Sequence, residues 1–353
     1  MSSRIAAIKP LGQKIWLDNI SREFLASGDL QKMITNDGIA CVTSNPAIFY
    51  KAISTDNRYQ EQLVELKKTN LTPLQRYEQM AVVDIRQACG IMRPIYDSSN
   101  GEDGYVSLEV SPDLCYEVDG TVKSALELWN AVNCPNLMIK VPATKEGIAA
   151  FEQLITLGIN VNITLLFSLP QVNAVWDAYI SALDKRAAQD LPVTNIKAVA
   201  SFFLSRVDSA VDDKLPTELQ GKTAINLARQ AYVDYQKIFN GARFAALKEK
   251  GAKGQYLLWA STGTKNKNYS DVLYIEELIG EDTINTVPDA TLDAFRDHGV
   301  AESRLTNGIQ NAATILAQVE ANGINLEELG EKLQKDGLQS FIEAFDKLIE
   351  LVK

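Results

Sequence analysis

The stretch LMIKVPAT, residues 137–144, decides the fold. It is apolar apart from one lysine, Lys140, and has the length of a buried strand. Side chains alternate between the two faces of a strand, so Leu137, Ile139 and Val141 share one face and Lys140 lies on the other. A lysine near a strand end usually extends its ammonium group to solvent or pairs with one acid. The rest of the chain favours a different role for Lys140.

Short apolar segments of this kind recur along the chain, and helical patterns such as 121–133 and 170–186 separate them. Eight strands are predicted, at 15–20, 40–45, 104–110, 137–143, 160–166, 197–204, 255–262 and 283–288. Eight strand–helix units predict an α/β fold, a (β/α)₈ TIM barrel with additional helices.

The chain is predicted to be a single domain over 1–353, because no Pro/Gly/Ser-rich boundary divides it. Residues outside the strand–helix repeat form helical excursions from the barrel: an insertion near 46–103, another near 205–254, and a helical C-terminal tail over 302–353. In the first insertion about two helices are expected, with Pro73 opening one and Pro94 following another.

The composition is that of an ordinary globular protein, with 46% hydrophobic and 23% charged residues in 353. The net charge of −10 disfavours a nucleic-acid or anionic-membrane partner, so an anionic substrate would need a local Lys/Arg cluster. No signal-peptide pattern and no apolar run of transmembrane length is found, which predicts a cytoplasmic protein.

The chain has no pattern of metal ligands, and no metal or cofactor is expected. The four cysteines, at 41, 89, 115 and 134, are widely spaced and are predicted to be free thiols. The one histidine, His298, precedes a glycine and is predicted to end a helix.

Polar side chains recur on the strand faces opposite the aliphatic ones, and they come late in each strand. Asp18, Asn45, Glu109 and Asn162 follow this pattern in four strands, and Thr164 shares the face of Asn162. Barrel active sites lie at the C-terminal ends of the strands. These groups are therefore expected to surround Lys140, a larger set than a structural lysine needs.

A lysine with two carboxylates, amides and hydroxyls suits one chemistry in particular. The amine attacks a carbonyl and forms a Schiff base, which is an electron sink for a carbanion. Carboxylates then carry the protons.

At these residues the chain resembles the transaldolase family, in its longer bacterial branch. Seven blocks match in order through nearly the whole chain: WLDNISR, VTSNPAIF, VSLEVSP, LMIKVPAT, NITLLFS, ASFFLSRVD and WASTGTKN. The resemblance implies a class I aldolase barrel that transfers a dihydroxyacetone unit from a ketose phosphate to an aldose phosphate, in the non-oxidative pentose phosphate pathway.

The same resemblance implies the catalytic roles. Lys140 is the Schiff-base lysine, and Asp18 is the acid/base at the donor hydroxyl whose deprotonation breaks the C–C bond. Glu109 and Thr164, with a bound water, handle the proton steps of carbinolamine and imine.

The substrate-binding positions are also implied by the resemblance. Asn45 and Asn162 bind the dihydroxyacetone hydroxyls, Ser201 and Arg206 bind phosphate, and Phe203 lines the pocket. In the seventh block many members of the shorter branch carry an arginine. This chain has Ser261 and Lys265 there, followed by Lys267, which is expected to be solvated.

Several alternatives stay open at this point. A fructose-6-phosphate aldolase-like enzyme would use the same lysine, although those aldolases are short and carry Tyr where this chain has Phe203. A barrel that binds sugar phosphates without turnover predicts a broken site. Asn45 precedes Pro46 and could be a turn residue, a role that is compatible with substrate binding. Arg206 could instead form a surface ion pair with Asp208 or Asp212. The oligomeric state is open, a homodimer included.

Overall fold

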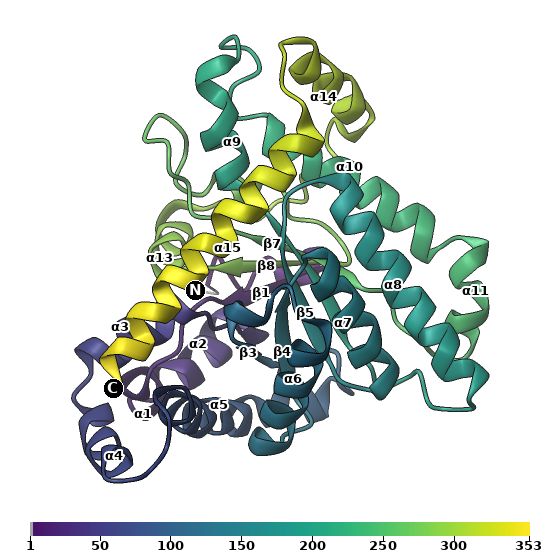
Figure 1. The fold of residues 1–353 in the computed structure, drawn as a ribbon. Helices are drawn as coiled ribbons and strands as arrows, with labels where there is room; N and C mark the ends of the chain where they lie inside the picture. The colour runs from purple at the N-terminus through teal and green to yellow at the C-terminus, as the bar shows by residue number, and fades with distance from the viewer. Residues whose placement is uncertain (1–2) are drawn as a thin grey trace.

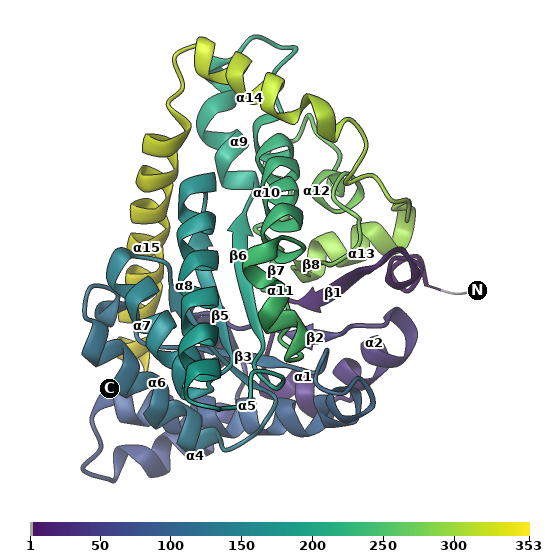
Figure 2. The same ribbon diagram turned by 90° about the vertical axis from the view of Figure 1, so that its right-hand side faces the viewer.

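The protein is described by a computed structural model that covers residues 3–353. Its centre is a closed barrel of eight parallel strands in sequential order (Figures 1 and 2). The strands are β1 (Gln13–Leu17), β2 (Cys41–Val42), β3 (Val106–Glu109), β4 (Leu137–Pro142), β5 (Val161–Leu166), β6 (Ala198–Phe203), β7 (Tyr256–Ala260) and β8 (Thr283–Val287). The predicted (β/α)₈ barrel is confirmed.

Helices surround this barrel and extend beyond it (Figure 2). They are α1 (Arg22–Ala26), α2 (Asp29–Asp37), α3 (Pro46–Thr55), α4 (Arg58–Lys67), α5 (Pro73–Ser98), α6 (Val118–Val132), α7 (Lys145–Leu157), α8 (Leu169–Ala188), α9 (Ser205–Val211), α10 (Thr223–Phe239), α11 (Ala242–Glu249), α12 (Leu273–Glu276), α13 (Asp289–His298), α14 (Ala312–Ala321) and α15 (Leu326–Leu351). Short 3₁₀ turns occur at Lys9–Leu11, Pro112–Leu114, Asp212–Lys214 and Ile309–Asn311. No described helix is both long and apolar enough to span a bilayer.

The first insertion differs from its prediction in two ways. It contains three helices, α3 to α5, where about two were expected. Pro73 opens α5 as predicted, but Pro94 lies inside that helix and does not follow it. A proline in a helix displaces the carbonyl four residues earlier, and here that residue is the exposed Gly90, whose carbonyl can turn to water.

The segment that carries Lys140 is held by its own sequence. β4 is buried along its whole length. Thr144 caps α7 by accepting a hydrogen bond from the backbone N–H of Gly147 at 2.8 Å. A side chain at Gly147 would place its Cβ 1.9 Å from the Pro142 carbonyl oxygen, so only glycine allows α7 to begin this close to the strand.

The helix α15 takes an unusual path for a barrel helix. Figure 1 shows it in yellow, crossing in front of the strands instead of lying parallel to one of them. It packs against α3, α5, α8, α9 and β5. The C-terminal tail therefore covers the barrel on the side where the predicted site lies.

The opposite, N-terminal end of the barrel is closed by charged groups. Lys197, which is buried, pairs with Glu102 at 2.8 Å and lies 4.2 Å from the centre of the Tyr256 ring. Lys253 contacts the same carboxylate at 3.2 Å, and Lys14 lies 3.7 Å from it. This end of the barrel holds an ion-pair network.

Candidate active site

Three predicted residues lie side by side on neighbouring strands. Glu109 of β3 is the register partner of Lys140 on β4, and Lys140 is the partner of Asn162 on β5. Direct partners in a sheet point to the same face. All three side chains are almost completely buried, and Lys140 and Asn162 line the same cavity, so they lie on the inner face of the barrel. Glu109 and Lys140 lie in the C-terminal half of their strands, whereas Asn162 is the second residue of β5.

The ammonium group of Lys140 is held by few partners. Its Nζ donates a hydrogen bond to the Ser44 carbonyl oxygen at 3.3 Å and lies 3.5 Å from Glu109 Oε2. On its other side the Phe341 ring of α15 has its centre 5.6 Å away. At 6% exposure Lys140 does not extend to solvent, so the snorkelling alternative does not apply.

Glu109 and Thr164 both carry unsatisfied oxygens. Within residues 3–353, neither Glu109 carboxyl oxygen has a hydrogen-bond partner, and neither has Thr164 Oγ1. The contact of Glu109 with Lys140 is therefore an ion pair of 3.5 Å and not a close hydrogen bond. Burial raises the pKa of Glu109 to about 7, although the charge of Lys140 opposes this.

Asp18 lies one residue beyond the end of β1, and not within a strand of 15–20 as predicted. Its Oδ1 accepts a hydrogen bond from Thr43 Oγ1 at 2.8 Å, and Thr43 in turn lies 2.9 Å from the Thr286 hydroxyl. Burial raises the pKa of Asp18, while the Lys140 charge and the Thr43 hydrogen bond act in the other direction.

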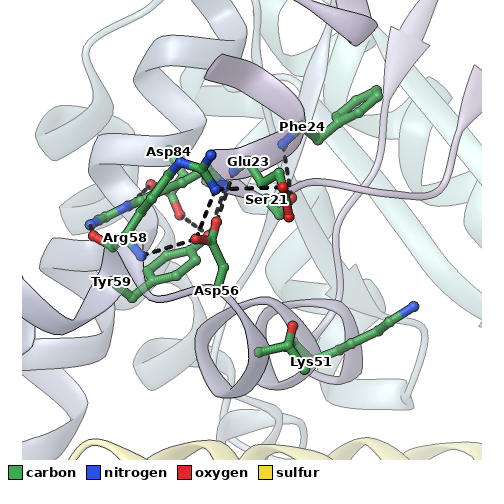
Figure 3. A network of polar contacts seen from close by, with 10 residues as sticks. Ser21, Glu23, Phe24, Lys51, Asp56, Arg58, Tyr59 and Asp84 are labelled. Carbon is green, nitrogen blue, oxygen red and sulfur yellow. Dashed lines mark hydrogen bonds and ion pairs between the residues drawn. The ribbon is translucent and has the colours of Figure 1, made fainter. Parts of the chain in front are cut away.

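The chain after Asp18 is anchored by a polar network, part of which Figure 3 shows. Asp84, completely buried, accepts from Arg22 Nε at 2.8 Å and from the Tyr59 hydroxyl at 2.7 Å. Asp56 accepts from the backbone N–H of Glu23 at 2.8 Å. These bonds fix the start of α1, and with it the turn that carries Asp18.

Two amides and a serine line the inner wall. Asn162 Oδ1 accepts from Ser201 Oγ at 2.7 Å, and its Nδ2 donates to Ser107 Oγ at 3.3 Å. Asn45 caps α3 by accepting from the Ile48 N–H at 3.0 Å. Asn45 therefore has a local structural role as a helix cap, and the residue also lines the cavity.

The two predicted cations lie near one another. The Arg206 guanidinium lies 5.7 Å from the centre of the Phe203 ring, and burial lowers its pKa. Lys265 lies in the loop after β7, and desolvation and then the charge of Arg206 lower its pKa. Two cations that repel one another favour an anion between or beside them.

Arg206 is not in the surface ion pair that the sequence left open. Asp208 accepts from the Tyr274 hydroxyl at 2.7 Å, and Asp212 accepts from the Tyr269 hydroxyl at 2.7 Å. Among the described residues no ion pair joins either acid to Arg206. Its charge is therefore available to a ligand.

Ser261 has an unusual backbone at the end of β7. Its φ is +54°, a left-handed conformation that is uncommon for a residue with a side chain. Two contacts with Ser205 hold it there, a backbone bond of 3.1 Å and a contact of 2.9 Å between the hydroxyl oxygens. This conformation places Ser261 on the cavity wall.

These side chains enclose one cavity of about 140 Å³. Its lining contains nine of the eleven predicted site residues together with four others: Asp18, Thr43, Asn45, Lys140, Asn162, Thr164, Ser201, Phe203, Arg206, Ala260, Ser261, Thr286 and Phe341. Glu109 contacts Lys140 but does not line the cavity, and Lys265 does not line it either. Thr43, Thr286 and Phe341 were not predicted; Thr43 shares the inward face of Asn45, but no local pattern indicates Phe341.

A lysine, two acids with raised pKa values and an arginine that makes no ion pair within residues 3–353 lie at one end of the barrel, and they match the resemblance seen in the sequence. The model of the family described as transaldolase/fructose-6-phosphate aldolase matches residues 15–352. The chain belongs to this family. The predicted family is thereby confirmed.

Relatives in several bacteria agree with this family. A transaldolase of Neisseria meningitidis serogroup A (strain Z2491) is 51% identical over 345 residues, 98% of each chain. A transaldolase of Thiobacillus denitrificans is 47% identical, with 97% of each chain covered. Transaldolase 2 of Nostoc punctiforme is 42% identical, with 99% of this chain and 96% of the relative covered. The predicted enzyme class, transaldolase, agrees with all three.

Proposed function

We propose that the protein is a transaldolase that moves a dihydroxyacetone unit between sugar phosphates through a Schiff base on Lys140. The donor is a ketose phosphate, sedoheptulose 7-phosphate or fructose 6-phosphate. The acceptor is an aldose phosphate, glyceraldehyde 3-phosphate or erythrose 4-phosphate. The observation that carries the proposal is a buried lysine, Lys140, with the carboxylate of Glu109 3.5 Å away and a raised pKa at that carboxyl group.

Imine formation comes first. The amine of Lys140 attacks the donor carbonyl carbon, and the carbinolamine loses its hydroxyl as water. A group that is protonated near neutral pH must supply the proton, and Glu109, with its pKa of about 7, is suited to do so. Thr164 Oγ1, without a partner in the described chain, is suited to relay this proton through a bound water.

Bond cleavage follows. Asp18 removes the proton of the donor hydroxyl next to the scissile bond, and the electron pair of the C–C bond moves into the protonated imine. Its raised pKa makes Asp18 a stronger base, and the Thr43 hydrogen bond holds its carboxylate in place. The aldose product leaves, and the three-carbon unit stays on Lys140 until an acceptor aldehyde arrives.

Substrate recognition divides along the cavity. Asn45 and Asn162 hydrogen-bond the dihydroxyacetone hydroxyls at the inner end, and Phe203 lines the wall between the two ends. Arg206, with Ser201, Ser261 and Lys265 as further members, binds the phosphate at the outer end. An arginine without an internal acid partner is the group best suited to hold a phosphate.

Partners and location are part of the proposal. The substrates are small sugar phosphates, and neither nucleic acid, a membrane nor a metal takes part. The proposed location is the cytoplasm, and a homodimer is compatible with the site, which one chain completes.

Borohydride reduction in the presence of fructose 6-phosphate tests the function. A stable adduct should form on Lys140. In a parallel reaction without borohydride, an added aldose phosphate should accept the three-carbon unit and be released as a new ketose phosphate. Release of free dihydroxyacetone at a comparable rate would indicate the aldolase alternative. A protein that gains no mass would be a binding barrel only.

A further inference from the structure

The helix α15 meets the site through one face. Gln334, Gly337 and Phe341 are spaced by three and four residues, so they lie on the same side of the helix. Phe341 lines the cavity beside Lys140. Gln334 Nε2 donates to the Ala143 carbonyl at 2.8 Å and to the Leu165 carbonyl at 3.0 Å. The helix is thus bonded to the ends of β4 and β5.

The strand end that Gln334 holds is irregular. Leu165 has a φ of +64°, which is left-handed, and the register between β5 and β6 shifts between Ile163 and Leu166. A leucine avoids this conformation unless its surroundings impose it. The bond from Gln334 fixes the distance between α15 and this bulge.

Gly337 occupies the point of closest approach. A Cβ at Gly337 would lie 3.0 Å from Leu165 Cδ2 and 3.2 Å from Arg206 Nη1. Both distances are shorter than ordinary van der Waals contact, so one neighbour would have to move. The Leu165 side chain is completely buried in the core, whereas the Arg206 side chain is partly exposed and makes no ion pair within residues 3–353, so Arg206 is the group that can move.

Helix formation does not explain the glycine at position 337. It lies inside a 26-residue helix, where glycine is disfavoured relative to alanine. It is buried and lies well inside the helix, so it serves neither a turn nor a helix end. The space that it leaves is bordered by a Leu165 methyl group and by the Arg206 guanidinium.

We propose that Gly337 is a positioning residue for substrate binding, because the gap it leaves under α15 sets the position from which Arg206 reaches the phosphate of the substrate. The inference rests on the proposed function, in which Arg206 binds that phosphate. The proposal makes α15 part of the phosphate subsite, although Gly337 has no side chain with which to contact the substrate.

The variant Gly337→Ala tests this. The Michaelis constant for fructose 6-phosphate should rise about tenfold or more, the loss expected when a charge-assisted hydrogen bond is weakened, while kcat stays within about twofold. Borohydride trapping with dihydroxyacetone, which has no phosphate, should proceed at the wild-type rate. The thermal unfolding midpoint of Gly337→Ala should stay close to that of the wild type, which would show that the core is not disrupted.

Two further variants separate an effect through Arg206 from a general effect of adding a methyl group inside a helix. Gly90→Ala places the same methyl group in the interior of α5, where nothing lies within 4 Å, and should leave the Michaelis constant unchanged. Arg206→Ala should itself raise the Michaelis constant for fructose 6-phosphate, and adding Gly337→Ala to it should raise that constant no further.

The results distinguish the two proposals. If Arg206→Ala weakens the phosphorylated donor but Gly337→Ala does not, or if the two effects add, the role of Gly337 is wrong and the proposed function stands. The role of Gly337 is also overturned if Gly337→Ala weakens the reaction with dihydroxyacetone as much as the reaction with fructose 6-phosphate. If Arg206→Ala has no effect, the phosphate assignment fails and the inference fails with it.

Discussion

Lys140 and Glu109 are direct partners on neighbouring strands, and 3.5 Å separates the ammonium nitrogen from the nearer carboxyl oxygen. The distance is long for a charge-assisted hydrogen bond. The pair is therefore not locked, and the amine of Lys140 can turn toward a carbonyl without first breaking a short bond. Glu109 stays close enough to exchange a proton with the product of that attack.

Replacement of Lys140 by alanine should abolish turnover and borohydride trapping. The nucleophile is lost, and among the described residues no other lysine lines the cavity. Intact-protein mass after reduction with fructose 6-phosphate measures this. Lys145→Ala is the matched control, since Lys145 starts α7 just beyond β4, and it should trap normally. Trapping by the Lys140 variant would assign the chemistry to another lysine.

Asp18→Asn should separate imine formation from bond cleavage. The amide keeps the size of the side chain but cannot accept the hydroxyl proton, so turnover should fall by roughly 10²–10⁴. Imine formation does not need this base, and borohydride should trap the whole six-carbon phosphate on Lys140. The time course of intact mass is the measurement. An adduct of only three carbons would show that cleavage proceeds without Asp18.

Glu109 should give the activity a pH dependence near neutrality. Burial raises its pKa to about 7 from 4.5, so the acid form is present at pH 6 and largely absent at pH 8. The rate of borohydride trapping should fall across this range because the proton donor is lost. In Glu109→Gln the trapping should be slow at every pH, and the inflection near 7 should disappear.

The same shift predicts the sign of a stability effect. The folded protein holds the Glu109 proton more tightly than the unfolded chain does. The stabilisation from this residue is therefore complete below pH 4.5 and is lost as pH rises through about 7. Urea midpoints of the wild type and of Glu109→Gln, compared at pH 5 and pH 8, measure the contribution. A wild-type midpoint that rises relative to the variant would contradict it.

Asp84→Ala should lower the free energy of unfolding by about 3–5 kcal/mol, the usual cost of removing one partner of a buried ion pair. It leaves Arg22 and the Tyr59 hydroxyl without their acceptor. Turnover should fall as well, because the turn that carries Asp18 loses its anchor. Asp97→Ala removes the exposed Arg93 pair and should cost about 1 kcal/mol or less. Denaturant titration and steady-state rates provide both readouts.

The strand faces could be predicted from the sequence because alternation is a local property. Glu109, Lys140 and Asn162 each stand opposite an aliphatic set, and the register of the barrel then brings them together. The exact strand ends could not be predicted in this way. Asp18 follows β1 instead of lying within it, although its backbone N–H still donates to the Val287 carbonyl oxygen of β8 at 3.1 Å.

Phe341 and Gln334 could not be predicted from local pattern. Gln334 bonds to Ala143 and Leu165, which precede it by 191 and 169 residues. Helical periodicity indicates that α15 has an apolar face but not which part of the barrel this face covers. The position of Pro94 was missed for a related reason, because the tolerance of a helix for proline depends on the environment of the carbonyl at Gly90.

The ion-pair network at the N-terminal end of the barrel has a consequence for engineering. Lys197, Glu102 and Tyr256 lie at the opposite end of the strands from Lys140, so they share no side-chain contact with the cavity lining. Substitutions around this network should therefore change the thermostability of the protein while leaving its turnover close to that of the parent. A directed-evolution library confined to this end should yield variants that tolerate heat better and keep the substrate preference of the parent.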